Sequence, residues 1–178
     1  MKLLGAILAG GQSRRFGSDK AAAMLEGRAL IDHVADALRA QCDALVVCGR
    51  EYGGVTSLPD RPRPDLGPLG GLCAALRYGL DQGFDAVLSA PCDVPDLPSG
   101  LGERLGRKGG AAFVSTLPVV GFWPCELAPG LDAHLRHADD RSMRAWARVA
   151  DARSVVLPIA PSNINTPEDL DARRHPKE

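Results

Sequence analysis

The feature that most constrains the fold is a short apolar run near the start of the chain, residues 3–9, which ends directly in Gly10 and Gly11. An uninterrupted apolar run of this length is typical of a strand buried on both faces of a parallel sheet. Residues 30–40 then carry apolar side chains at the spacing of one helical face, and residues 44–48 form another apolar run. Strand, helix and strand in this order predict a right-handed βαβ unit and hence an α/β fold.

A second unit of the same kind follows a stretch rich in proline, residues 60–68, which we expect to be irregular. A glycine pair and small residues after it favour a helix over 72–80, and residues 84–90 read as another buried strand. That strand ends at a polar turn containing Asp93. Because ligands of open α/β sheets bind at the carboxyl ends of strands, Asp93 and the first glycine pair should lie on the same edge.

The rest of the chain is less regular. Helices are expected over residues 97–105, 131–137 and 142–149, and strands over 111–115, 118–123 and 154–157. Near the end, Thr166 suits a helix N-cap, Pro167 suits the first helical position, and Asp169 can complete a capping box.

Composition limits the classes of function. The chain has 178 residues, 45% of them hydrophobic, which fits one domain over residues 1–178. A net charge of -1 argues against binding of nucleic acid or of a membrane surface as the main activity. Five cysteines without CxxC spacing indicate reduced thiols, and no apolar run approaches the length of a membrane span. We therefore expect a cytoplasmic protein.

The loop after the first strand has the composition of a phosphate-binding loop. Its glycines allow backbone N–H groups to approach a phosphate or a base edge closely. Arg14, Arg15 and Lys20 supply enough positive charge to hold a polyphosphate. The spacing matches neither GxxxxGK[ST] nor GxGxxG, so the loop belongs to neither of these nucleotide-binding classes.

The segment LAGGQSRRFGSDK, residues 8–20, resembles the signature of small nucleotidyltransferases, specifically of the molybdenum cofactor guanylyltransferases (MobA). Three further stretches agree in order and spacing: Asp60 followed by GPLGGL at 67–72, PCDVP at 91–95, and NINTPEDL at 163–170. The resemblance implies a three-layer Rossmann-like nucleotidyltransferase fold with a mostly parallel twisted sheet.

The activity that the resemblance implies is transfer of GMP from GTP to molybdenum-molybdopterin, with release of pyrophosphate. It also implies Mg²⁺ as cofactor, and molybdenum-insertion proteins and molybdoenzyme chaperones as protein partners. Two alternatives stay open: cytidylyl or other nucleotidyl transfer to a small phosphorylated acceptor, and a nucleotide-binding homologue without turnover.

The resemblance assigns roles to individual residues. Asp93, after a buried strand, is the best candidate for Mg²⁺, which prefers one or two carboxylates together with phosphate oxygens and water. Arg15 and Lys20 would stabilise the pyrophosphate leaving group, so the predicted catalytic residues are Arg15, Lys20 and Asp93. The predicted GTP-binding residues are Leu8, Ala9, Gly10, Gly11, Lys20, Cys48, Asp60, Gly70 and Asp93, and the predicted metal ligands are Asp93 and Asn165.

Some assignments have competitors within the sequence. Asp65 is the alternative to Asp60 as the contact to the nucleoside, and Asn163 is the alternative to Asn165. Cys48 stands where the family commonly has an asparagine, and a thiol is a much weaker hydrogen-bonding group. The region 111–123 is shorter than usual in the family, so the binding of the second substrate is the least determined part of the prediction.

Overall fold

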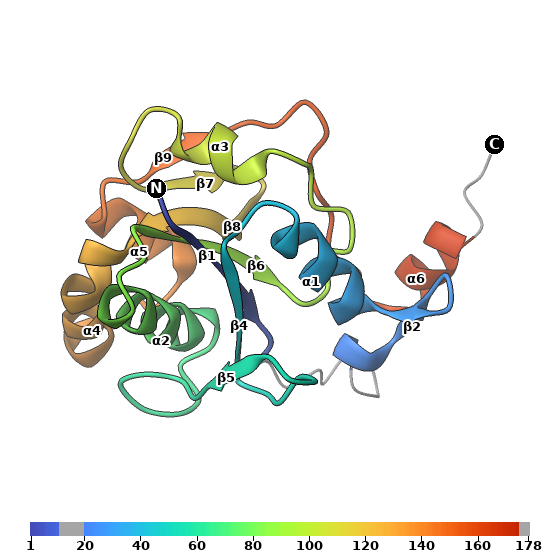
Figure 1. Cartoon of the computed structure of the whole chain (residues 1–178), viewed down its shortest axis with the longest axis horizontal. Helices are drawn as coiled ribbons and strands as arrows, with labels where there is room; N and C mark the ends of the chain where they lie inside the picture. Colours follow the sequence, from blue (N-terminus) through green and yellow to red (C-terminus); the bar gives the residue numbers. More distant parts are fainter. Residues whose placement is uncertain (11–19, 175–178) are drawn as a thin grey trace.

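A seven-stranded sheet with helices on both faces forms the body of the protein (Figure 1). The structure, a computed structural model, describes residues 1–10 and 20–174. Predictions that concern Gly11, Arg14 and Arg15 therefore lie outside the described residues. In the described part of the chain, no helix combines the length and the apolar character that crossing a bilayer requires.

The sheet is mostly parallel, as the sequence predicts. Its order is β5-β4-β1-β6-β8-β7-β9, and only the β8 pairings, with β6 and β7, are antiparallel. The strands are β1 (Leu3–Leu8), β4 (Ala44–Cys48), β5 (Thr56–Leu58), β6 (Ala86–Pro91), β7 (Ala112–Val114), β8 (Leu117–Pro124) and β9 (Arg153–Val155). The chain passes from β1 to β4 on one side and later places β6 on the other side of β1. The strand order therefore reverses beside β1, where α/β proteins bind their ligands.

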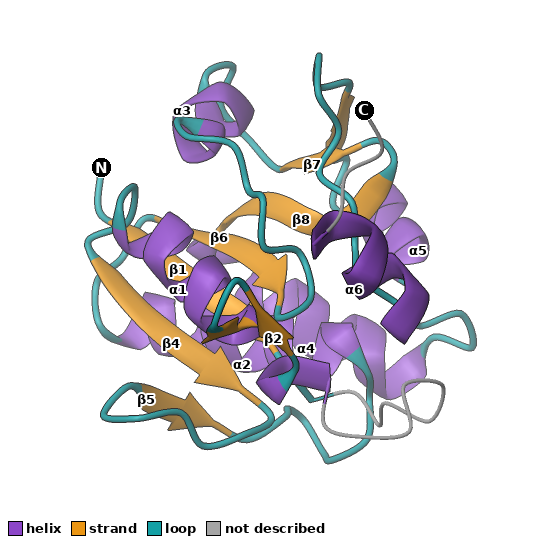
Figure 2. Ribbon diagram, turned by 90° about the vertical axis from the view of Figure 1, so that its right-hand side faces the viewer, coloured by secondary structure: helices purple, strands orange, loops and turns teal. Residues whose placement is uncertain are grey.

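Helices cover both faces of the sheet and complete three layers (Figures 1 and 2). On one face lie α2 (Pro68–Asp81), α4 (Ala128–His137) and α5 (Met143–Val149), and on the other lie α1 (Leu30–Arg39) and α3 (Leu101–Gly106). Strand β1 packs Leu4 toward the first group of helices and Ile7 toward the second. This burial on both faces explains why β1 reads as an uninterrupted apolar run.

Several boundaries differ from the sequence prediction. Helix α2 begins at Pro68 rather than at residue 72, because proline is favourable in the first helical turn, where its missing N–H is not needed. The expectation that Pro68 prevents regular structure is therefore wrong, and Gly70 lies inside the helix. Helix α3 begins later than expected and α4 earlier. The short strand β5 was not expected, because three residues give too little periodicity.

A small unit stands apart from the main sheet, at the right of Figure 1. It consists of the hairpin β2 (Met24–Leu25) and β3 (Arg28–Ala29), neither of which was expected, together with α6 (Pro167–Arg174). Its small core contains Leu25, Leu30 and Ile164. The unit therefore joins the segment after Lys20 to the NINTPEDL segment.

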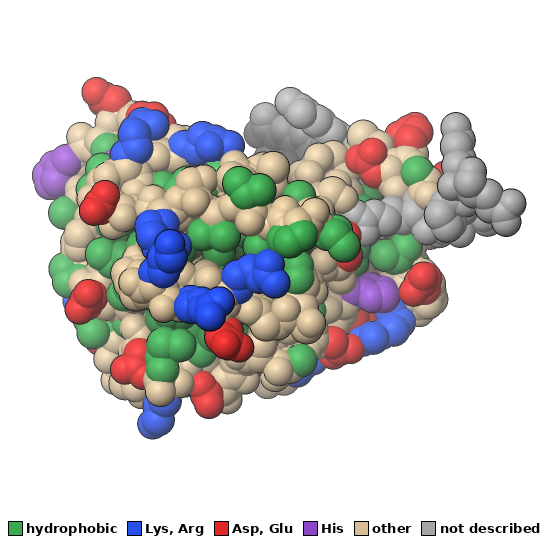
Figure 3. Space-filling model, turned by 90° about the horizontal axis from the view of Figure 1, so that it is seen from above, with side chains coloured by type: hydrophobic (Ala, Val, Ile, Leu, Met, Phe, Trp, Pro, Cys, Tyr) green, Lys and Arg blue, Asp and Glu red, His purple; other side chains and the backbone are tan. Residues whose placement is uncertain are grey.

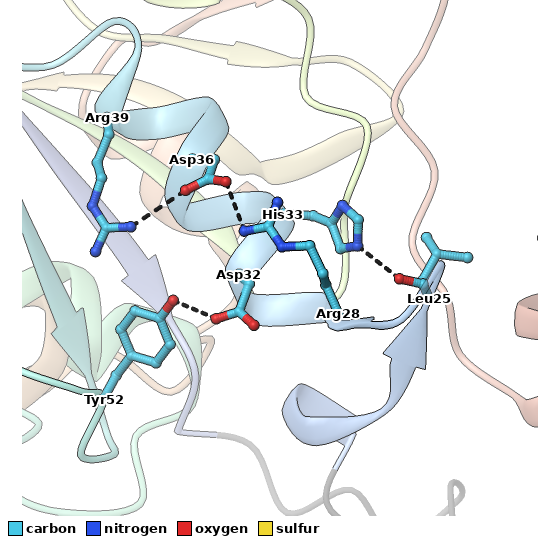
Figure 4. A network of polar contacts seen from close by, with 7 residues as sticks. All are labelled: Leu25, Arg28, Asp32, His33, Asp36, Arg39 and Tyr52. Atoms are coloured by element: carbon cyan, nitrogen blue, oxygen red, sulfur yellow. Dashed lines mark hydrogen bonds and ion pairs between the residues drawn. The ribbon is translucent and has the colours of Figure 1, made fainter.

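Polar contacts fasten this hairpin to α1 (Figure 4). The guanidinium of Arg28 donates a hydrogen bond to the Asp36 carboxylate at 2.7 Å, and a ring nitrogen of His33 lies 3.0 Å from the carbonyl oxygen of Leu25. On the other side of α1, the hydroxyl of Tyr52 donates to Asp32 at 2.5 Å. Helix α1 thus holds the hairpin on one side and the loop after β4 on the other.

The surface is mixed in charge. Lys and Arg side chains gather near the centre of the face that Figure 3 shows, with Asp and Glu side chains around them. The net charge of -1 therefore conceals local basic regions.

Candidate active site

The carboxyl ends of β1 and β4 approach each other at the level of the backbone. The amide of Ala9 donates to the carbonyl of Cys48 at 2.9 Å, and the amide of Gly49 donates to the carbonyl of Leu58 at 3.0 Å. A Cβ atom on Gly49 would lie 2.3 Å from the Cα of Gly10, and the φ of Gly49 is +87°. Only glycine fits there. Gly49 was missed in the sequence, although it follows its strand directly, much as the glycine pair follows the first strand.

The Asp60 carboxylate lies beside this pair of strand ends. A Cβ atom on Gly70 would lie 2.9 Å from Asp60 Cγ, and one on Gly10 would lie 3.6 Å from Asp60 Oδ1. The carboxylate is thus held between the end of β1 and the first turn of α2. Gly70 lies inside α2 and leaves room for this carboxylate, while its predicted role in GTP binding stays a prediction.

The charge of Asp60 is affected by its position. Partial burial raises the pKa of its carboxyl above the ordinary value of 3.8, a hydrogen bond from the backbone of Leu66 opposes that rise, and the nearby charge of Asp65 adds to it. Asp65 itself is exposed and sits at a positive φ of 61°. Of the two carboxylates that the sequence left open, Asp60 is the one that contacts the glycines of this edge.

The side chains of Leu8 and Cys48 belong to the core. Cys48 is 1% exposed, and a Cβ atom on Gly71 would lie 2.9 Å from Cys48 Cβ and 3.2 Å from Leu8 Cδ2. Burial raises the pKa of the Cys48 thiol to about 12, so the thiol is neutral. A ligand at this edge would meet main-chain atoms of these two residues, and the predicted roles of Leu8 and Cys48 in GTP binding stay predictions.

On the other side of β1, the turn after β6 meets the NINTPEDL segment. Asp93 is half-buried, and its carbonyl oxygen accepts a hydrogen bond from the amide of Ile164 at 2.9 Å. The side chain of Asn163 donates to Oδ1 of Asn165 at 3.0 Å. The structure therefore brings Asp93 into the same turn region as both candidate asparagines, far apart though they are in the sequence.

The donor atoms in this region are of the kind that a hard cation prefers. The Asp93 carboxylate and the amide oxygens of Asn163 and Asn165 are oxygen ligands, as Mg²⁺ requires. The described residues contain no cluster of three or more His, Cys, Asp or Glu side chains that could hold a metal ion. A Mg²⁺ ion held by few protein ligands leaves coordination positions for phosphate oxygens and water, so the residues present fit such an ion.

The segment that carries Asn165 is fixed at both ends. The Thr166 hydroxyl accepts from the amide of Asp169 at 3.1 Å, and the Asp169 carboxylate accepts from the amides of Thr166 and Asn165 at 3.0 and 2.9 Å. The predicted capping box is confirmed. On the other side, Ile164 is 1% exposed in the small core beneath the hairpin.

The predicted phosphate-binding residues are placed only in part. The backbone of Lys20 begins a 3₁₀ turn, Lys20–Ala22. The side chain of Lys20 and the whole of Gly11 and Arg15 are not among the parts of the chain that the structure describes. Ala9 is half-buried and Gly10 is exposed, so both are accessible to a ligand. The described site thus has two parts, one around Gly10 and Asp60 and one around Asp93 and Asn165, at the ends of the neighbouring strands β1 and β6.

Comparison with known proteins identifies the family. The family model described as a MobA-like NTP transferase domain matches residues 5–154. This chain belongs to the MobA-like NTP transferase family. The resemblance drawn from the motifs, the three-layer fold and the nucleotidyltransferase class are thereby confirmed.

Relatives within the MobA-like family match over almost the whole chain. A molybdenum cofactor guanylyltransferase of Cereibacter sphaeroides is 37% identical over 96% of this chain and 94% of its own length. One from Rhizobium leguminosarum bv. trifolii is 34% identical over 95% and 90%. In structure, the molybdopterin-guanine dinucleotide biosynthesis protein A of Archaeoglobus fulgidus has a TM-score of 0.77 at 22% identity, with 96% of each chain covered.

Proposed function

We propose that this MobA-like protein transfers GMP from GTP to the terminal phosphate of molybdenum-molybdopterin and releases pyrophosphate, with Mg²⁺ as cofactor. One observation carries the proposal: two carboxylate residues lie at the ends of neighbouring strands. Asp60 lies against the backbone of glycine residues. The backbone of Asp93 is hydrogen-bonded to the turn that contains the asparagines. The names of relatives that are 34–37% identical over nearly the whole chain support the same reaction.

In this proposal, the region around Gly10 and Asp60 binds the guanosine. Exposed backbone at Gly10 can meet the base closely because no Cβ stands in the way. When ionised, the Asp60 carboxylate can only accept hydrogen bonds, so it is suited to the N–H or O–H donors of a nucleoside. Its partial burial strengthens such bonds, because less water competes for them.

The region around Asp93 and Asn165 acts on the phosphates. These two residues would hold Mg²⁺, which supplies charge neutralisation at the phosphate oxygens. Arg15 and Lys20 would bind the β- and γ-phosphates. An oxygen of the acceptor phosphate forms the bond to the α-phosphorus while the bond to the bridging oxygen of the β-phosphate breaks, and pyrophosphate leaves with that electron pair. The protein thus contributes positioning and charge rather than a covalent intermediate.

The proposal extends to the cellular context. Molybdenum-insertion proteins would deliver the acceptor, and molybdoenzyme chaperones would receive the product. The five free cysteines, three of them buried, suit a reducing compartment, and we place the reaction in the cytoplasm.

Product mass is the most direct test. The protein is incubated with Mg²⁺, molybdenum-molybdopterin and either GTP or CTP, and the products are weighed by mass spectrometry. We expect the guanine dinucleotide and an equal amount of pyrophosphate with GTP, and neither product with CTP. Formation of the cytosine dinucleotide in preference would overturn the assigned base.

Two substitutions separate an enzyme from a binding protein. Asp93→Asn and Lys20→Ala should each lower the rate by about 10² to 10³, the usual cost of one lost contact to developing charge. Asp139→Asn and Lys108→Ala change exposed residues elsewhere and serve as matched controls. Full activity of the Asp93→Asn protein would contradict the proposed chemistry.

A further inference from the structure

A cavity of about 270 Å³ lies between α2 and α4, outside the candidate active site. Its polar and charged lining comes from three separate elements: Arg61 in the loop before α2, Cys73 and Arg77 on α2, and Asp132 and Arg136 on α4. None of these five residues belongs to the site predicted from the sequence. In Figure 1, α2 and α4 lie side by side on one face of the sheet.

Positive charge is in excess at this cavity. The Nε of Arg136 donates to the Asp132 carboxylate at 2.7 Å, so one of the three guanidinium groups has a counter-ion. Among the described residues, no ion pair is formed by Arg61 or Arg77, and both side chains are on the surface. Two guanidinium groups therefore reach the same cavity without a carboxylate of their own.

The other two groups in the lining leave this excess in place. The bond from Arg136, together with the charges of Arg61 and Arg77, keeps the pKa of the Asp132 carboxyl below its ordinary value, so only one negative charge is present. Burial raises the pKa of the Cys73 thiol to about 11, which keeps it neutral. The charges of all three arginines act to lower the pKa of Asp132 and oppose the rise in the pKa of Cys73, as expected if the three guanidinium groups lie close to both side chains.

The size of the cavity restricts what it can hold. A volume of 270 Å³ lies below the roughly 300–1,000 Å³ of pockets that enclose drug-sized ligands. Arginine forks match the oxygens of phosphate groups, with two parallel hydrogen bonds from each guanidinium. A small phosphate anion therefore suits the cavity in size and charge.

We propose that the cavity between α2 and α4 is a second anion site that binds small inorganic phosphates, pyrophosphate above all, through Arg61 and Arg77. Arg61 directly follows Asp60, and its amide donates to the carbonyl of Gly70 at 3.1 Å, so the loop that lines the cavity is also the loop of the candidate active site. Pyrophosphate is the first probe because the proposed reaction releases it. That choice rests on the proposed function, whereas the anion site itself does not.

The test measures pyrophosphate binding by isothermal titration calorimetry. The background variant is Arg15→Ala with Lys20→Ala, which removes the phosphate contacts predicted for the active site. Arg77→Gln should weaken binding about tenfold, the effect of one hydrogen bond to a charged group. Asp132→Asn should strengthen binding several-fold, because it removes the one carboxylate that competes with the anion. Arg107→Gln, an exposed arginine outside the lining, is the matched control and should change nothing.

The outcomes distinguish this site from the reaction. Binding that responds in opposite directions to Arg77→Gln and Asp132→Asn supports the site even if guanylyl transfer fails. Equal affinities in the Arg77→Gln and Arg107→Gln proteins would overturn it. GTP binding that is equally sensitive to Arg77→Gln would contradict the restriction to small anions. Binding of a short poly-glutamate peptide in place of pyrophosphate would also overturn the proposal and indicate a surface for an acidic protein.

Discussion

The two parts of the candidate active site are built by different means. Around Gly10 and Gly49, the backbone itself is the surface, and strand ends approach so closely that a single Cβ atom has no room. Around Asp93 and Asn165, the site is made of polar side chains on turns, held by hydrogen bonds and by one buried isoleucine. Adding one Cβ atom to the first part should therefore cause a large loss of stability. Removing a supporting side chain from the second part should cause a smaller loss of stability and weaker binding of Mg²⁺.

The largest effect is expected for Gly49→Ala. The added Cβ would lie 2.3 Å from the Cα of Gly10 at a φ of +87°, so both backbone strain and a backbone clash oppose it. We expect the free energy of unfolding to fall by about 3 kcal/mol, measured by urea denaturation. Gly53→Ala is the control, because nothing lies within 4 Å of its Cβ position and it should cost almost nothing. Similar stabilities of the two variants would refute the close approach.

Ile164→Ala tests the support of the second part. Ile164 is 1% exposed, and its loss should lower the free energy of unfolding by about 2 kcal/mol, the low end for buried isoleucine because the cluster is small. The amide of Ile164 bonds to Asp93, so the Mg²⁺ concentration for half-maximal activity should also rise several-fold. Ile159→Ala, at a site 81% exposed, should change neither quantity. An unchanged Mg²⁺ requirement in Ile164→Ala would contradict the positioning role.

Gly70→Ala returns to the first part with a smaller expected effect. Gly70 and Gly130 are both the third residue of their helices, α2 and α4. A Cβ on Gly70 would lie 2.9 Å from the Asp60 carboxylate, whereas one on Gly130 would come no closer than 3.7 Å to another side chain. Alanine in a helix gains up to about 1 kcal/mol over glycine, so Gly130→Ala should be stabilising.

The kinetics of these two helix variants separate binding from folding. Gly70→Ala should displace Asp60 and raise the KM for GTP about tenfold with little change in kcat, as expected for a contact that binds substrate and transition state equally. Gly130→Ala should leave both constants unchanged. An unchanged KM for GTP in the Gly70→Ala protein would contradict the proposed role of Asp60 in binding the nucleotide.

The parts of the molecule that the sequence predicts well are those with local signals. Strand β1 is recognisable because burial on both faces requires an uninterrupted apolar run, and the capping box at Thr166 is recognisable because its two partners are three residues apart. The motif resemblance correctly identified the family over almost the whole chain.

Features that depend on distant segments could not be predicted in the same way. The need for glycine at residue 49 arises from Gly10 on another strand, and the bond between Ile164 and Asp93 joins two turns that no local pattern connects. The start of α2 was mispredicted because Pro68 reads as a breaker until the helix is known to begin there. Individual site residues such as Arg15 and Lys20 stay predictions, because their side chains lie outside the described part of the chain.

The smallest effect is expected from neutralising Asp60. The sign of the resulting change in stability should be opposite to that of a surface carboxylate paired with an arginine. Because burial raises the pKa of Asp60 in the native state, the native protein binds more protons than the unfolded chain as the pH rises above about 3.8. Stability is therefore lost as Asp60 ionises. Asp60→Asn should raise the free energy of unfolding slightly at pH 7 and leave it unchanged at pH 3.

Asp132 provides the opposite case for comparison. Its pKa is lowered by the hydrogen bond from Arg136, so its ionised form stabilises the native state above the unfolded pKa, and that stability is lost as the pH falls. Asp132→Asn should therefore lower the stability slightly at pH 7 and have no effect at low pH. Urea denaturation of both variants across this range checks the pair. Effects of the same sign would contradict the burial of Asp60 against the glycines of the first part of the site.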